Sequence, residues 1–165
     1  MIKKILILTL VILVVGCAQE TQSETINWQN IKLKDVNSQE TFTISQFEKP
    51  ILLESFAVWC PTCTRQQNEI KKLHEEDNSF ISITLDTDPN EDESLVKEHT
   101  DKHGFDWRYV ISPRELTQEL VNILGINFVN APSAPIALLC PGKEPTMLNI
   151  GFKSKDELKE ALSQC

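Results

Sequence analysis

The chain has 165 residues, of which 41% are hydrophobic and 24% are charged, and this balance is typical of a single globular domain. The formal net charge of −8 argues against nucleic acid as a partner, because a phosphate backbone repels an acidic surface. No internal repeat follows the first 25 residues, so one domain of alternating strands and helices is expected, acting as a monomer.

The amino-terminal segment differs from the rest of the chain. Two lysines precede an apolar run over residues 5–15, which is too short to span a bilayer comfortably and is typical of a secretory signal. The sequence Val14-Val15-Gly16-Cys17 then resembles the lipobox of bacterial and archaeal lipoproteins, in which the cysteine carries the lipid. We therefore expect a signal peptide at 1–16, a lipid on Cys17 and a polar tether over 17–25. The alternative is that Cys17 is an ordinary cysteine of an uncleaved leader.

From residue 26 to the end, strand and helix signals alternate. A hairpin is predicted from segments 31–36 and 41–44, and the nearly continuous apolar run 51–58 predicts a strand buried on both faces of a sheet. Further strands are expected at 80–85, 107–111, 135–140 and 146–150, and helices at 61–76, 91–103, 113–124 and 154–164. Capping boxes are expected for the last two helices, at Ser112–Glu115 and Ser154–Glu157.

Cys60-Pro61-Thr62-Cys63 lies where the buried strand meets the first helix. Unpaired backbone N–H groups and a partial positive charge at a helix amino end stabilise a thiolate there, and the thiolate is the attacking species in disulfide exchange. Cys60 is therefore the predicted nucleophile. Cys63, one turn further into the helix, is predicted to be the shielded thiol that resolves the mixed disulfide.

Metal binding is the main alternative for these two cysteines. A zinc site needs four ligands, and no second Cys-x-x-Cys or Cys/His pair with suitable spacing follows. A purely structural disulfide closing so small a ring would constrain little chain. We expect redox chemistry without a diffusible cofactor or a bound metal.

Phe56-Ala57-Val58-Trp59-Cys60-Pro61-Thr62-Cys63 resembles the thioredoxin family, in particular its extracytoplasmic branch of TlpA, ResA and the cytochrome c maturation (CcmG/DsbE) thioredoxins. The resemblance covers about residues 31–165. It implies an α/β thioredoxin fold over residues 26–165, with a central mixed sheet flanked by helices, an amino-terminal hairpin and a helical insert.

The resemblance also implies roles for particular residues. Glu54 occupies the position of a buried acid that relays the proton of the second cysteine, and burial in an apolar strand should raise its pKa. Substrate contacts are expected from Trp59, Pro61 and Thr62. Family members place a cis-proline beside the disulfide, and here Ala134-Pro135 is the favoured match, with Pro132 as the alternative.

The expected function is that of a membrane-anchored, extracytoplasmic thiol–disulfide oxidoreductase. It would reduce protein disulfides, in cytochrome c maturation or a related process, and a membrane electron donor of the DsbD or CcdA type would recharge it. The alternative is a copper-binding lipoprotein on the same fold, although copper-delivering relatives space their cysteines by three residues.

The remaining titratable residues have simpler expected roles. Cys140 and Cys165 should meet at the pole away from the active cysteines and form a structural disulfide, since a strand and the last helix both run in that direction. The alternative is a buried Cys140 and a free Cys165. The acidic residues 86–93 are expected to form a solvated loop without calcium-ligand spacing, and His74, His99 and His103 to be surface residues.

Overall fold

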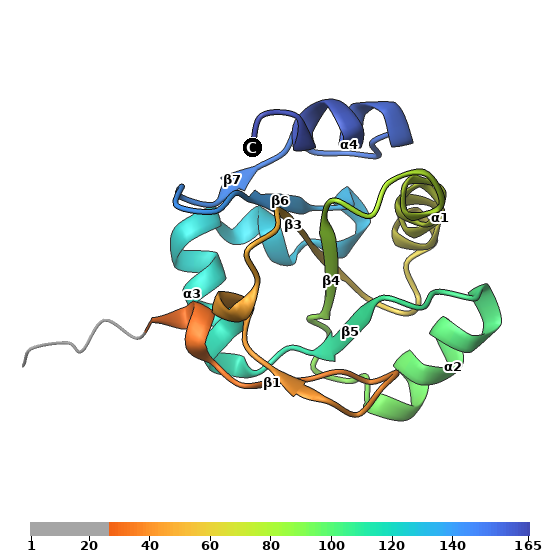
Figure 1. Ribbon diagram of the computed structural model, residues 1–165. Coiled ribbons are helices and arrows are strands. Elements are labelled where there is room, and N and C mark those ends of the chain that lie inside the picture. The colour runs from red at the N-terminus through yellow and green to blue at the C-terminus, as the bar shows by residue number, and fades with distance from the viewer. Residues whose placement is uncertain (1–26) are drawn as a thin grey trace, which may run out of the picture.

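The structure is a computed structural model and describes residues 27–165 (Figure 1). The predicted signal peptide, the tether and the lipid site Cys17 lie outside the described residues. None of the helices in residues 27–165 has the length and apolar character that a bilayer crossing requires.

A five-stranded mixed sheet forms the centre of the molecule, with the strand order β5-β4-β3-β6-β7. Strand β3 runs parallel to β4 and antiparallel to β6, and β4 is parallel to β5. The strands are β3 (Ile51–Phe56), β4 (Ile81–Asp86), β5 (Arg108–Ile111), β6 (Ile136–Leu139) and β7 (Thr146–Met147). Every residue of β3 is buried, which confirms the prediction of a strand covered on both faces.

Helices cover both faces of this sheet, as Figure 1 shows. One apolar cluster packs α1 (Pro61–Glu76), α2 (Glu93–His103) and α4 (Lys155–Leu162) against the sheet. A second cluster packs α3 (Arg114–Leu124) and the amino-terminal hairpin against the other face. The order of the elements, the topology of the sheet and the layers of helices are those of the expected thioredoxin fold. Helix α2 is the expected helical insert.

The leading hairpin is shorter than predicted. It consists of β1 (Leu33–Lys34) and β2 (Thr41–Phe42), which form their own two-stranded sheet. The turn that follows β1 is joined to β5, because Val36 N–H donates to the Tyr109 carbonyl (2.7 Å) and Tyr109 N–H donates to Asp35 Oδ1 (3.0 Å). The hairpin therefore closes the β5 edge of the molecule.

The two predicted capping boxes have different outcomes. Ser154 and Glu157 form one at the start of α4, with both reciprocal hydrogen bonds present. The box predicted at Ser112–Glu115 is wrong: Pro113 is the N-cap of α3, and no side chain caps that end. The Ser112 hydroxyl instead pairs with Thr117 Oγ1 at 2.8 Å.

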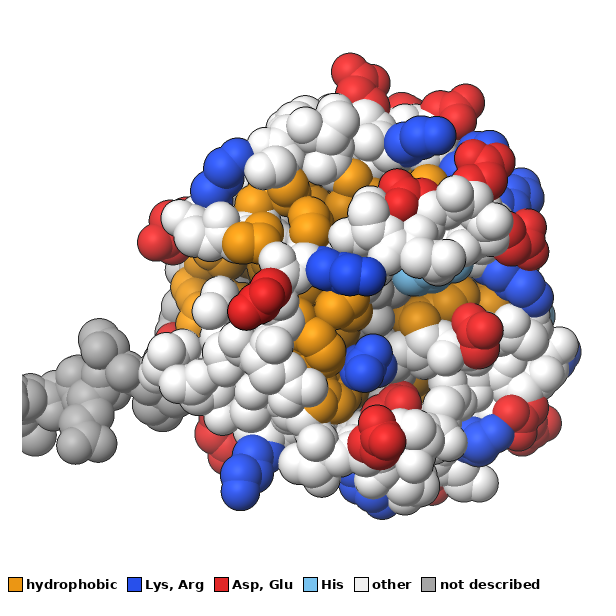
Figure 2. All heavy atoms as spheres, viewed as in Figure 1, with side chains coloured by type: hydrophobic (Ala, Val, Ile, Leu, Met, Phe, Trp, Pro, Cys, Tyr) orange, Lys and Arg blue, Asp and Glu red, His pale blue; other side chains and the backbone are white. Residues whose placement is uncertain are grey.

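Short 3-10 segments connect several elements: Trp28–Asn30, Ile44–Gln46, Ile126–Val129 and Ala131–Ser133. The last of these connects the end of the α3 region to β6 and passes the amino end of α1. On the face seen in Figure 2, apolar side chains are gathered across the middle, and charged side chains lie both among them and around the rim.

Candidate active site

Cys60 and Cys63 lie at the junction of β3 and α1 and form a disulfide, with their Cα atoms 5.3 Å apart. The chain turns after β3, where Cys60 N–H donates to the Ala57 carbonyl at 3.1 Å. Cys60 is the N-cap of α1, and Pro61 begins the helix at the position where a missing N–H costs nothing. The Cys63 N–H donates to Cys60 Sγ at 3.2 Å, so the helix amino end directly stabilises negative charge on that sulfur.

The two sulfurs have different surroundings. Cys60 lines an open hollow of about 520 Å³ together with Trp59, Pro61 and Thr64 on one side and residues of α2 on the other. Cys63 is fully buried, and its Sγ lies 3.2 Å from the Ala131 carbonyl oxygen, to which the reduced thiol can donate. Cys60 is itself only 1% exposed, so the two cysteines differ in that Cys60 borders a hollow that opens to the surface.

Glu54 is completely buried in β3. Burial raises its pKa to about 8, against the opposing effects of Gln67, Thr84 and the positive charge of Lys153. Its Oε2 accepts a hydrogen bond from the Thr84 hydroxyl (3.2 Å), while Oε1 has no hydrogen-bond partner within the described part of the chain. A carboxyl group in this environment exchanges its proton near the pH at which thiols ionise.

His99 is also buried, so the prediction of a surface histidine is wrong for it. Its Nε2 donates to Gln67 Oε1 at 2.7 Å, and its ring packs against Phe56 and Phe105. Burial lowers its pKa to about 4, with help from the nearby charges of His103 and Lys102. Phe56 of β3 and Gln67 of α1 explain the error, because both lie at least 32 residues from His99 in the sequence.

The acidic segment after β4 is docked on the active-site turn, so the expectation of a fully solvated loop is also wrong. Glu91 Oε2 accepts a hydrogen bond from the Val58 N–H and Asp88 Oδ2 accepts one from the Trp59 indole, each at 2.7 Å. Asp86 is buried, and burial raises its pKa to about 7. These acidic residues come at the end of a central strand and directly after it. That position in the sequence could have indicated their place at the active-site turn.

The substrate contacts expected from Ala134 and Pro135 stay a prediction. Both residues are buried, and their carbonyl oxygens accept hydrogen bonds from Lys153 Nζ and from Ser55 N–H. The peptide bonds before Pro132 and Pro135 are trans, like all others in residues 27–165. Ala134 instead makes the sharp turn with a left-handed backbone (φ 45°).

Pro132, the alternative of the sequence analysis, is placed differently. It is exposed, and with Ala131 it lines a second hollow of about 410 Å³. Trp59, whose side chain is 58% exposed, lines both hollows and separates them. Pro61 is exposed and Thr62 half-buried at the rim of the cysteine pair.

Cys140 and Cys165 form the second disulfide of the described residues, with Cα atoms 5.1 Å apart. Cys140 follows β6 and Cys165 follows α4. Since β3 and β6 are antiparallel, the end of β6 lies beside Ile51, at the opposite end of β3 from Cys60. This bond therefore lies at the pole away from the active cysteines.

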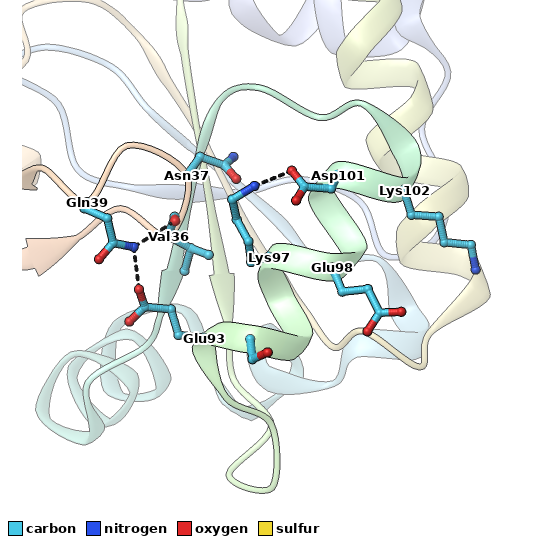
Figure 3. A pocket seen from close by; sticks show the side chains of 9 residues that line it. Val36, Asn37, Gln39, Glu93, Lys97, Glu98, Asp101 and Lys102 are labelled. Carbon is cyan, nitrogen blue, oxygen red and sulfur yellow. Dashed lines mark hydrogen bonds and ion pairs between the residues drawn. The ribbon is translucent and has the colours of Figure 1, made fainter.

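A larger open hollow of about 940 Å³ lies on the other side of α2, between that helix and the turn after β1 (Figure 3). Its walls carry charged side chains, and Gln39 is hydrogen-bonded to Glu93 across it, as the dashed lines in Figure 3 show. It contains no cysteine, so it is not the redox site. Within residues 27–165, no three His, Cys, Asp or Glu side chains are grouped in a way that could hold a metal ion.

A thioredoxin fold that carries a disulfide-forming cysteine pair at the amino end of α1, with the first cysteine beside an open hollow, defines a thiol–disulfide oxidoreductase of the thioredoxin type. The sequence profile of the Redoxin family matches residues 22–141, and the chain belongs to that family.

Solved structures with the same fold have low sequence identity to this chain. DsbF of MTB is 16% identical, with a TM-score of 0.65 over 83% of this chain and 96% of that one. A secreted disulfide oxidoreductase of Mycobacterium tuberculosis is 15% identical, with a TM-score of 0.64 over 84% and 97% of the two chains. StoA from Bacillus subtilis is 17% identical, with a TM-score of 0.62 over 79% and 93%.

One curated relative, an uncharacterized protein of Haemophilus influenzae, is 39% identical over 61 residues. The match spans 36% of this chain and 38% of that protein.

Proposed function

We propose that this protein reduces disulfides in protein substrates outside the cytoplasm. The observation that carries the proposal is the different setting of the two cysteines: Cys60, although only 1% exposed, borders an open hollow and its Sγ accepts the Cys63 N–H, whereas Cys63 is fully buried three residues further along. The Cys60 thiolate attacks a substrate disulfide, forming a mixed disulfide and releasing one substrate thiolate, which takes a proton from water. The Cys63 thiolate then attacks Cys60 Sγ and releases the second substrate sulfur.

Glu54 is the proposed proton acceptor in the second step. Cys63 must lose its proton before it attacks, and a buried thiol holds its proton more tightly than an exposed one. The pKa of the buried Glu54 carboxyl, about 8, is close to the pKa of a thiol. Transfer of a proton from the thiol to Glu54 therefore requires little free energy. Glu54 then returns the proton to water after the disulfide has closed.

The substrate is proposed to lie across Trp59, with Pro61, Thr62 and Pro132 around it. Trp59 offers an exposed apolar face, and its indole is held by Asp88, so little side-chain freedom is lost when a polypeptide covers it. The hollows on either side of Trp59 would accept side chains that flank the substrate cysteine.

Export and lipid attachment are part of the proposal and are supported by the sequence of residues 1–25. A lipid on Cys17 would hold the protein at the outer face of the cell membrane. A membrane electron donor of the DsbD or CcdA type would reduce the pair again, and cytochrome c maturation is a candidate pathway. The described Mycobacterium tuberculosis relative is a secreted protein, in agreement with this location.

The reduction potential of the Cys60–Cys63 couple tests the direction of electron flow. We expect a value near the −270 mV of thioredoxin, measured by equilibration with glutathione. A value near −120 mV would identify an oxidant instead. Mass spectrometry of the membrane fraction, compared with a Cys17→Ala variant, tests the anchor: a diacylglycerol-modified amino-terminal Cys17 is expected only in the parent protein.

A further inference from the structure

We propose that Lys153 is a positioning residue for this exchange: its buried ammonium group holds negative charge on Glu54, so that Glu54 can take the proton of Cys63. The inference rests on the proposed role of Glu54 and adds a second residue to it. Lys153 lies between β7 and α4, and neither strand nor helix signals single it out in the sequence.

The burial of Lys153 is unusual for a lysine. Only 5% of the residue is exposed, although lysine side chains are almost never fully buried unless they are paired. Its backbone is fixed from both sides by the buried side chain of Gln66, which accepts from Lys153 N–H (2.7 Å) and donates to the Lys153 carbonyl (3.0 Å). Gln66 belongs to α1, three residues after Cys63, so the helix of the cysteine pair also anchors this lysine.

The ammonium group lies beside the start of β6, the strand that pairs with β3 at Glu54. Lys153 Nζ donates to the carbonyl oxygen of Ala134, two residues before β6. Ile136, the first residue of β6, is paired with Glu54 across the sheet. Gly151 N–H also donates to the Ser133 carbonyl (2.9 Å), which ties the two segments together.

The groups that act on Glu54 come from four elements. They are Gln67 of α1, Thr84 of β4, Tyr109 of β5 and Lys153. Among these four, Lys153 alone carries a positive charge, since Gln67 and Thr84 are neutral and burial holds the Tyr109 hydroxyl protonated. His99, which is hydrogen-bonded to Gln67, is neutral at pH 7, and Asp106 and Glu157 act on Tyr109 and Lys153 respectively.

The two buried charges support each other. Burial lowers the pKa of Lys153 to about 8, and the negative charge of Glu54 acts in the opposite direction. The positive charge of Lys153 likewise lowers the pKa of Glu54. Each group therefore favours the charged form of the other, against the cost of burial.

The chemical step follows directly. The proton of the Cys63 thiol passes to the Glu54 carboxylate, the resulting Cys63 thiolate attacks Cys60 Sγ, and the bond between Cys60 and the substrate sulfur breaks. The substrate leaves with the electron pair of that bond and takes a proton from water. Lys153 makes and breaks no bond in these steps. It determines the fraction of Glu54 that is ionised when Cys63 must lose its proton.

Lys153→Gln tests the proposal, because glutamine keeps a hydrogen-bond donor for Ala134 and removes the charge. The rate of the resolving step would be measured by stopped flow between pH 6 and 10, and the Glu54 titration by carbon-13 NMR of the carboxyl group. We expect the midpoint of the pH–rate profile and the midpoint of the Glu54 titration both to move up by at least about one pH unit. This shift lowers the rate at pH 7 about tenfold. Lys153→Arg should restore the parent midpoint.

Lys155→Gln is the matched control, because Lys155 is two residues away and pairs with Glu76 at the surface. It should leave both midpoints unchanged. In a Glu54→Gln background, Lys153→Gln should cause no further loss of rate. If Lys153→Gln slows exchange equally with and without Glu54, or leaves the midpoints unmoved, the proposal is overturned.

The failure of this proposal is separable from failure of the proposed function. If Lys153→Gln behaves like the parent while Cys60→Ser is inactive, only the role of Lys153 is lost. If Lys153→Gln does not fold, the Glu54→Gln/Lys153→Met double variant removes both buried charges together and should fold. It should then show the rate of Glu54→Gln alone, and a further drop would contradict the proposal.

Discussion

The backbone N–H of Cys63 donates to Sγ of Cys60 at 3.2 Å, so the second cysteine of the pair stabilises the thiolate of the first through its main chain. This bond exists because Cys60 is the N-cap residue and Cys63 is the third residue of α1. An N-cap side chain accepts a hydrogen bond from the N–H of the third helical residue, so two residues lie between them. The same number of residues separates Cys60 from Cys63.

Replacing Cys63 with serine should trap covalent complexes between Cys60 and substrate proteins. Cys60 keeps the hydrogen bond from the N–H of residue 63 and its place beside the hollow, whereas no thiol remains to resolve the mixed disulfide. Non-reducing electrophoresis after incubation with a disulfide substrate would reveal the complexes. Cys60→Ser is the control and should trap none, and the reverse pattern would show that the two cysteines have exchanged roles.

Replacing Glu54 with glutamine should slow exchange more than it harms folding, because the volume is kept and the proton acceptor is lost. The parent rate should rise with pH through about 8, where Glu54 ionises, and the variant should lose this rise. An identical pH profile of the two proteins between pH 6 and 9 would exclude proton transfer by Glu54.

The same variant should change the pH dependence of stability. The pKa of Glu54 in the folded protein is about 8, above its usual value of 4.5, so the folded state holds the proton more tightly. Stability therefore falls as the pH rises from 4.5 to about 8. Glutamine has no such dependence. Between pH 5 and pH 8, we expect Glu54→Gln to gain stability over the parent by on the order of 3–4 kcal/mol, measured by urea unfolding.

His99 should make the fold sensitive to acid. Its pKa is about 4 in the folded protein and 6.5 ordinarily, so the unfolded state binds the proton first and stability is lost as pH falls from 6.5 toward 4. Relative to His99→Gln, the parent should lose up to about 2 kcal/mol between pH 7 and pH 5. His103→Gln is the control, and an equal loss in the parent and His99→Gln would show that His99 does not titrate in this range.

Removing the Cys140–Cys165 disulfide should lower stability and leave the chemistry intact. The bond closes a loop with a sequence separation of 25, worth about 3 kcal/mol in the chain-entropy model. The Cys140→Ser/Cys165→Ser variant should unfold at lower urea concentration and keep the parent potential of the Cys60–Cys63 couple. Peptide mapping of the non-reduced parent checks the bond itself, and alkylated Cys140 and Cys165 would show that it does not form.

The sequence by itself determined the elements and the position of the redox pair. The apolar run before Cys60, the proline after it and the stripe at Ile70 and Leu73 depend on residues that are near one another in the chain, so strand, turn and helix follow from local rules. Boundaries shifted by one to three residues, and the capping box at Ser112 failed, because local hydrogen-bond choices compete there.

Only the tertiary structure decided which distant residues surround that pair. His99, Glu91 and Lys153 lie in segments whose sequences suggest solvent exposure, yet each has a hydrogen-bond partner near the site on another element, and His99 and Lys153 are buried there. The same holds for Ala134 and Pro135, which the sheet buries, and for Pro132, which it leaves exposed. The physical reason is that burial depends on what packs against a residue, and the pKa values that govern exchange depend on burial more than on any neighbour in the chain.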